Sequence, residues 1–314
     1  MLRREEMISR IAMALSLAGL LAGVSATSLP AGTQAISVED LPSPLELVRA
    51  AVANEVAAAN DSSIKHMFCQ HRKTPQGSQT RLYVETREAM AGMTIAYNDK
   101  PLSPQQLQSE EGRLAGLVSN PDQLRHKQRQ EKEEAERTLR IVKALPDAFL
   151  FDYDGTEVGT GSLGREGVRL VRLKFRPNPA YRPPSHVEDA LVGMRGVVLI
   201  DSASRRVARI DGTLFKDVSF GWGILGHLDK GGHFFVQQED LGDGSWDISC
   251  MRLEFTGKIL LFKTIAIKSE EVFSNFRRVP PNTTFAEGVE MLKAELARLA
   301  QGGSETARAE GKSH

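Results

Sequence analysis

The segment Val171-Arg172-Leu173-Lys174-Phe175-Arg176 decides the fold class of this chain. Apolar and basic residues alternate in it, which is the period of two expected of a strand with one buried and one solvated face. This alternation is typical of antiparallel sheets, because strands of parallel sheets are buried on both faces. The blocks GVVLID (196–201) and RVARIDG (206–212) follow, separated by a short polar turn, and predict a hairpin.

Strand-like segments continue on both sides of these blocks. They are expected at residues 63–73, 81–87, 93–97, 149–153, 206–220, 233–238, 246–255 and 259–268, with the last continuing toward 278. Pro44 opens a helix with one apolar stripe, and a closing helix is expected from Thr284 to Leu299. The chain is therefore predicted to be α+β, with a curved antiparallel sheet on which an N-terminal and a C-terminal helix pack.

Residues 103–145 form a helical insert in this pattern. Ser103-Pro104 starts one helix and Asn120-Pro121 starts a second. Residues 125–134 of the second helix contain no apolar side chain, and an inward stripe begins only after them. We expect the charged part to be a solvated helix face, the alternative being a flap that lies over another element.

The first residues have the features of a secretory signal peptide. Arg3, Arg4 and Arg10 precede an uncharged apolar run at 11–24, which is shorter than the roughly 20 residues that span a bilayer. Small residues at 24–26 match a signal peptidase site. We expect residues 1–26 to be removed, the alternative being an uncleaved membrane anchor, and the protein to be periplasmic or secreted in a bacterial envelope.

The remainder is expected to comprise a flexible leader at 27–41, one domain at 42–300 and a disordered tail at 301–314, with no transmembrane segment. Removing residues 1–26 from a chain with 40 basic and 40 acidic residues leaves 37 against 38. This balance gives no electrostatic reason to expect nucleic acid as a partner.

Two cysteines, Cys69 and Cys250, fall in strand-like segments far apart in the sequence. In an oxidising compartment they can pair, and the alternative is two separate buried thiols. The sequence leaves both open, because it does not reveal the geometry that a disulfide requires.

No recognised catalytic motif is present, so we do not expect an enzyme or a cofactor. The segment GTGSLG (159–164) has the spacing of a dinucleotide-binding loop but precedes a strand rather than a helix, which predicts a hairpin loop. His227, Asp229 and His233 surround a short glycine turn and are weak candidates for metal ligands. Surface histidines in a turn are the simpler interpretation.

The order of a helix, hairpins, inserted helices and a long antiparallel meander resembles the LolA/LolB lipoprotein-carrier superfamily, including RseB-type domains. The blocks 196–201 and 206–212 are similar to its strand, Asp turn, strand hairpin. The chain also resembles uncharacterised exported bacterial proteins. The resemblance implies an unclosed half-barrel whose cavity, plugged by helices, holds acyl chains, and it brings no catalytic residues. The inserted helices and greater length depart from a LolA carrier, so it supports ligand binding more than lipoprotein transport.

Three functions follow as hypotheses. The first is a carrier or chaperone-like binder of a lipid, acyl chain or other apolar small molecule, whose cavity-facing candidates are Leu82, Val84, Phe149, Leu173, Phe175, Ile210 and Leu214. The second is a non-enzymatic interaction or envelope-stress sensor module that contacts an envelope protein. The contact surface is either the charged helix or a binding mouth with the apolar residues Trp222, Ile224 and Leu225. The third is a metal-dependent enzyme that uses the histidine turn.

Overall fold

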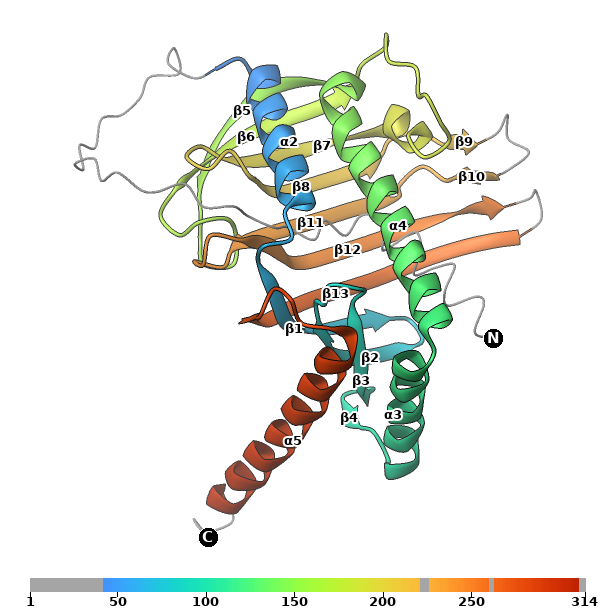
Figure 1. Ribbon diagram of the computed structural model, residues 1–314. Helices are drawn as coiled ribbons and strands as arrows, with labels where there is room; N and C mark the ends of the chain where they lie inside the picture. Colours follow the sequence, from blue (N-terminus) through green and yellow to red (C-terminus); the bar gives the residue numbers. More distant parts are fainter. Residues whose placement is uncertain (1–41, 221–225, 260–262, 311–314) are drawn as a thin grey trace. The chain divides into compact units, whose positions relative to one another are not determined.

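The computed structural model describes residues 42–220, 226–259 and 263–310 (Figure 1). These residues form two compact units. Unit 1 comprises the chain through Ser63 together with Glu134–Glu270, and unit 2 comprises Ile64–Glu133 together with the chain from Glu271. The expected signal peptide and leader lie outside the described residues, and one domain over 42–300 stays a prediction.

Unit 1 contains an open antiparallel sheet. Its strand order is β13-β12-β11-β8-β7-β6-β5, and β9 and β10 form a short pair beside β12. The strands are β5 (Phe149–Val158), β6 (Arg169–Pro177), β7 (Met194–Asp201), β8 (Val207–Leu214), β9 (Val218–Phe220), β10 (Gly226–Leu228), β11 (His233–Asp240), β12 (Trp246–Ile259) and β13 (Lys263–Val279). The order ends at β5 without closing, so the predicted α+β fold with an open antiparallel sheet is confirmed.

The predicted hairpin is formed by β7 and β8, which pair in antiparallel register. Asp201 Oδ1 accepts hydrogen bonds from the backbone amides of Ala203 and Ser204 at 2.9 and 2.7 Å. Arg205 completes the turn with a φ of +52°. An aspartate that accepts hydrogen bonds from the amides two and three residues ahead fixes a tight turn. Because these contacts involve only neighbouring residues, the sequence alone predicts the turn.

Helix α2 (Pro44–Asn60) begins with a complete capping box, in which Ser43 and Glu46 bond to each other's backbone amides. Its buried residues Leu47, Val48, Ala51 and Val52 pack against apolar residues of β6, β7 and β8. Helix α4 (Pro121–Ala148) reaches unit 1 with its C-terminal part, where Val142 and Leu145 contact the same cluster. Helix α2 and the C-terminal part of α4 lie on one face of strands β5–β8 (Figure 1).

Unit 2 has its own sheet and its own core. The strand order is β4-β3-β2-β1-β13, with β13 contributing its residues from Glu271 onward. The elements are β1 (Lys65–Thr74), β2 (Gly77–Val84), β3 (Ala91–Tyr97), β4 (Lys100–Pro101), α3 (Pro104–Ser119) and α5 (Phe285–Glu310). Leu82, Val84, Met93, Leu114 and Leu292 are among its buried core residues.

The inserted helices are α3 and α4, and they begin where the sequence predicts. The charged stretch 125–134 is mostly exposed, as expected for a solvated face, although Glu131 accepts a hydrogen bond from the Met90 amide at 2.9 Å. Helix α5 extends past Leu299 to Glu310, into the segment expected to be disordered. None of the helices in the described part of the chain is long and apolar enough to cross a membrane.

Candidate ligand cavity

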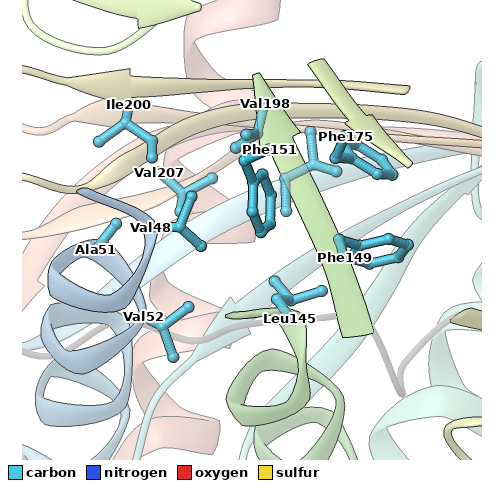
Figure 2. Close-up of a pocket in the computed structure, with 11 residues that line it drawn as sticks. Val48, Ala51, Val52, Leu145, Phe149, Phe151, Phe175, Val198, Ile200 and Val207 are labelled. Atoms are coloured by element: carbon cyan, nitrogen blue, oxygen red, sulfur yellow. The ribbon is translucent and has the colours of Figure 1, made fainter. Parts of the chain in front are cut away.

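Unit 1 contains an apolar cavity of about 30 Å³ between α2, the end of α4 and strands β5–β8 (Figure 2). Every residue that lines it has an aliphatic or phenyl side chain: Val48, Ala51, Val52, Leu145, Phe149, Phe151, Phe175, Val198, Ile200, Val207 and Ile210. A space of this size admits about one water molecule, and an apolar lining offers that water no hydrogen-bond partner. The lining therefore favours apolar contents over water.

Local geometry explains how β8 directs two residues into the cavity. Val207 and Ile210 are three positions apart, so a regular strand would point them to opposite faces. The register between β7 and β8 shifts between Leu199 and Ile200: Leu199 pairs with Arg209, whereas Ile200 pairs with Val207. Ala208 is the additional residue of this bulge, which reverses the alternation and places Val207 and Ile210 on the same, cavity-lining face.

Three phenylalanines form one end of the lining. The rings of Phe149 and Phe175 are 4.7 Å apart and tilted by 57°, and those of Phe149 and Phe151 are 6.3 Å apart and nearly perpendicular. Phe149 and Phe175 are 4% and 7% exposed. These tilted arrangements are favourable for aromatic pairs, and they make this end the bulkiest part of the wall.

A buried ion pair fixes the C-terminal half of α2 to the β7–β8 turn. Glu55 is 1% exposed and Arg206 is 5% exposed. The Arg206 Nε and Nη2 atoms donate to the two carboxylate oxygens of Glu55 at 2.8 and 3.0 Å, and the Val207 amide also donates to Glu55 at 2.9 Å. Asn54 donates to the carbonyl oxygens of the turn at 3.1 and 3.2 Å. We call this set the latch.

Four charged residues of β5 and β6 lie on the face opposite the cavity and are paired with one another: Asp154, Glu157, Arg172 and Lys174. Arg172 donates to Asp154 at 2.8 Å and to Glu157 at 2.6 Å. Hydrogen bonds from Lys174 and then Arg172 lower the pKa of Asp154 below its usual value. From Val171 to Arg176, β6 thus alternates buried apolar side chains on one face with charged side chains on the other.

The structure distributes the seven cavity candidates among different places. Phe149, Phe175 and Ile210 line the cavity, and Leu173 is buried in the adjoining cluster of unit 1. Leu82 and Val84 belong to the core of unit 2, and Leu214 is buried in unit 1, so these three residues lie outside the cavity lining. The lining also includes Val48, Ala51 and Val52 of α2, which are not among the seven candidates. They belong to the apolar stripe expected for the helix that begins at Pro44.

The structure does not bring the three residues of the histidine turn together into one group. His233 Nε2 is 2.8 Å from Asp211 Oδ1 across the β8–β11 pair, whereas His227 Nε2 is 3.2 Å from Asp229 Oδ1. No group of three metal-ligating side chains occurs within the described ranges. The GTGSLG segment connects the antiparallel strands β5 and β6 and precedes no helix, as predicted.

The remaining candidates are the apolar residues of the Trp222 segment and the two cysteines. Trp222, Ile224 and Leu225 lie outside the described residues. Cys69 in β1 and Cys250 in β12 are free, half-buried thiols, and burial raises the pKa of both.

Comparison with known proteins identifies no family. No family model matches the sequence, and no curated protein matches it. Among solved structures, a DUF1329 family protein from Desulfovibrio piger is similar at a TM-score of 0.24 and 10% sequence identity, over 75% of this chain and 93% of that one. A similarity this distant does not assign a function.

Proposed function

We propose that this protein is an exported binder of an apolar ligand, such as a lipid or an acyl chain, and that its site is the space between α2, α4 and strands β5–β8. The observation that carries the proposal is the cavity itself, which is lined by eleven apolar residues and no polar one. Ligand affinity would come from burial of apolar surface, at roughly 25 cal/mol per Å².

Binding requires this site to open, because about 30 Å³ is far smaller than an acyl chain. Val48, Ala51 and Val52 of α2 form one wall, so displacement of the helix enlarges the space directly. The latch holds the C-terminal half of α2 and therefore favours the closed state. The ligand replaces the contacts that the helix gives up, which limits the cost of opening.

Export and family membership are part of the same proposal. The basic residues before the apolar run at 11–24, and the small residues at 24–26, support a cleaved signal peptide. An open antiparallel sheet with helices on one face is the arrangement expected of the LolA/LolB/RseB-like superfamily, and this supports placing the chain there.

The test is to express the whole chain with a C-terminal tag in a Gram-negative bacterium and to purify it from the periplasm. Native mass spectrometry and organic extraction then identify any co-purifying molecule. We expect residues 1–26 to be absent and a lipid of defined mass to be bound. Addition of N-phenyl-1-naphthylamine, a fluorescent apolar probe, reports binding if the protein is purified empty.

Matched variants locate the site. Phe175→Glu places a charge in the cavity wall, and Val52→Phe fills the space without a charge. Arg176→Glu changes the next residue on the opposite, solvated face and is the control. Loss of ligand and of probe binding in both cavity variants, but not in the control, would support the proposal. A folded wild-type protein that carries no lipid and binds no probe would refute it.

A second candidate is a non-enzymatic interaction or envelope-stress sensor module. The observation that favours it is the mostly exposed charged stretch 125–134 of α4, which has no apolar side chain to bury. Replacing Arg125, Lys132 and Glu133 by Ser should abolish crosslinking to a specific envelope protein and leave probe binding unchanged. Unaltered crosslinking would exclude this surface.

A further inference from the structure

The hydroxyl of Tyr181 is buried and has no hydrogen-bond partner within the described part of the chain. The tyrosine packs against the cluster of Ala148, Phe149, Phe175 and Leu191. Phe149 and Phe175 also line the cavity, so the cluster against which Tyr181 packs adjoins the aromatic end of the cavity. Buried tyrosine hydroxyls usually have a partner, because leaving a polar group dry and unpaired is unfavourable.

The backbone, rather than the hydroxyl, holds Tyr181 in place. Its amide donates to the Asn178 carbonyl oxygen at 3.0 Å. The Asn178 amide donates to Ala148 at 2.8 Å, and its side chain donates to the Asp147 carbonyl oxygen at 2.9 Å, which ties the turn to the end of α4. The backbone at Tyr181 is thus positioned without the hydroxyl, which is available to another group.

The surroundings decide what that group can be. Burial raises the pKa of Tyr181, and the nearby carboxylates of Glu188 and Asp147 raise it further. The hydroxyl therefore stays protonated and can donate a hydrogen bond at neutral pH. Two acidic groups nearby disfavour an anion at the same place.

We propose that Tyr181 donates a hydrogen bond to a neutral acceptor of the bound ligand, such as an ester or amide carbonyl oxygen. This inference rests on the proposed function and deepens it, because it distinguishes an esterified or amidated acyl chain from a free fatty acid. Tyr181 does not line the closed cavity, so the widening that admits the ligand must extend the space past Phe149 and Phe175 to this hydroxyl.

The experiment measures displacement of N-phenyl-1-naphthylamine by methyl laurate, laurate and n-tetradecane. For Tyr181→Phe we expect methyl laurate to bind about two- to tenfold more weakly than to the wild type, the range for one hydrogen bond, with n-tetradecane unchanged. The wild type should bind methyl laurate more tightly than laurate. Tyr97→Phe is the control for binding, because Tyr97 lies in β3 of unit 2 and is 45% exposed.

Thermal unfolding without ligand gives an independent measurement. Tyr181→Phe removes an unpaired hydroxyl and should leave the Tm unchanged or raise it, whereas Tyr153→Phe removes a hydrogen bond and should lower it. A drop in Tm for Tyr181→Phe like that for Tyr153→Phe would show that the hydroxyl has a partner without ligand, and would overturn the inference.

The binding data separate the two proposals. If the wild type binds none of the three molecules or the fluorescent probe, the proposed function itself fails. If it binds methyl laurate and Tyr181→Phe binds it equally well, the protein remains an apolar-ligand binder and the role of Tyr181 is wrong. Tighter binding of laurate than of methyl laurate would overturn the preference for a neutral acceptor.

Discussion

Replacing Glu55 by Leu should destabilise unit 1 more than any exposed charge substitution. The two partners of the ion pair are 1% and 5% exposed, so Arg206 would keep a buried cation without a carboxylate. Breaking a buried pair from one side costs about 3–5 kcal/mol of the free energy of unfolding. The amide of Val207 also loses its acceptor, so we expect a loss of about 4 kcal/mol.

The double variant Glu55→Leu/Arg206→Met provides the sharper measurement. Replacing both members of a buried ion pair by apolar residues is often nearly neutral, because no charge remains desolvated. We therefore expect the double variant to be at least as stable as Glu55→Leu alone. The double variant should lose less free energy of unfolding than the two single variants lose in sum, and the difference should be about 1–3 kcal/mol.

Urea unfolding followed by tryptophan fluorescence measures these effects in unit 1. Trp246 is 3% exposed, and its ring lies 5.8 Å from the Arg206 guanidinium, so it reports on the region that changes. A Trp222→Phe background makes Trp246 the single tryptophan. Glu254→Leu is the control, because its ion pair with Lys268 is exposed and worth less than about 1 kcal/mol. Additive single variants, or a loss below about 1 kcal/mol for Glu55→Leu, would refute the role of the latch.

Three further predictions concern the cavity, an ion pair of unit 2 and the thiols. Val207→Ile adds a methylene to the cavity and should raise the free energy of unfolding by up to about 0.8 kcal/mol in the same urea assay. Val171→Ile, at a fully buried position outside the lining, should lower it by about 1 kcal/mol. Equal effects of the two variants would argue against a void at Val207. Hydrogen bonds from Arg298 and Arg277 lower the pKa of Glu295 to about 2, so its contribution is present above its unfolded pKa near 4.5 and is lost as the pH falls toward 2. Glu295→Gln should flatten the decrease in Tm over this range, and an unchanged slope would contradict the prediction. Cys69 and Cys250 should both react with Ellman's reagent in denaturant and slowly in the native protein, since burial raises their pKa; no reaction in denaturant would indicate a disulfide.

Local sequence signals predicted most of the sheet and the starts of the helices. The alternation of residues 171–176 gives the burial pattern of β6 directly, because side chains of a strand point to alternate faces. Capping boxes also depend on neighbours in the sequence, and those that begin with Ser43 and Ser103 are formed in the structure. These features need no knowledge of the rest of the chain.

The sequence alone could not predict which residues line the cavity. Leu82 and Val84 have the alternation of an inward face, but the sequence does not reveal that their strand packs in the core of another unit. Val207 and Ile210 share a face only because of the bulge at Ala208, which breaks the period of two. The pairing of Glu55 with Arg206, residues distant in the sequence, likewise depends on the tertiary fold.

The proposed binding of an apolar ligand larger than the cavity requires α2 to move, and the latch determines which part of the helix moves most easily. The apolar residues of α2 lose contacts with the sheet when the helix moves, and an apolar ligand restores contacts of the same kind, so the two contributions largely cancel. The ion pair has no counterpart on such a ligand. Val48 lies nearer the N-terminus of α2 and can leave the sheet while Glu55 stays bonded to Arg206. This movement therefore costs less free energy than release of the whole helix. This predicts that opening begins at the N-terminal end of α2, where the hydrogen bond between Tyr153 and Pro42 is the contact to break.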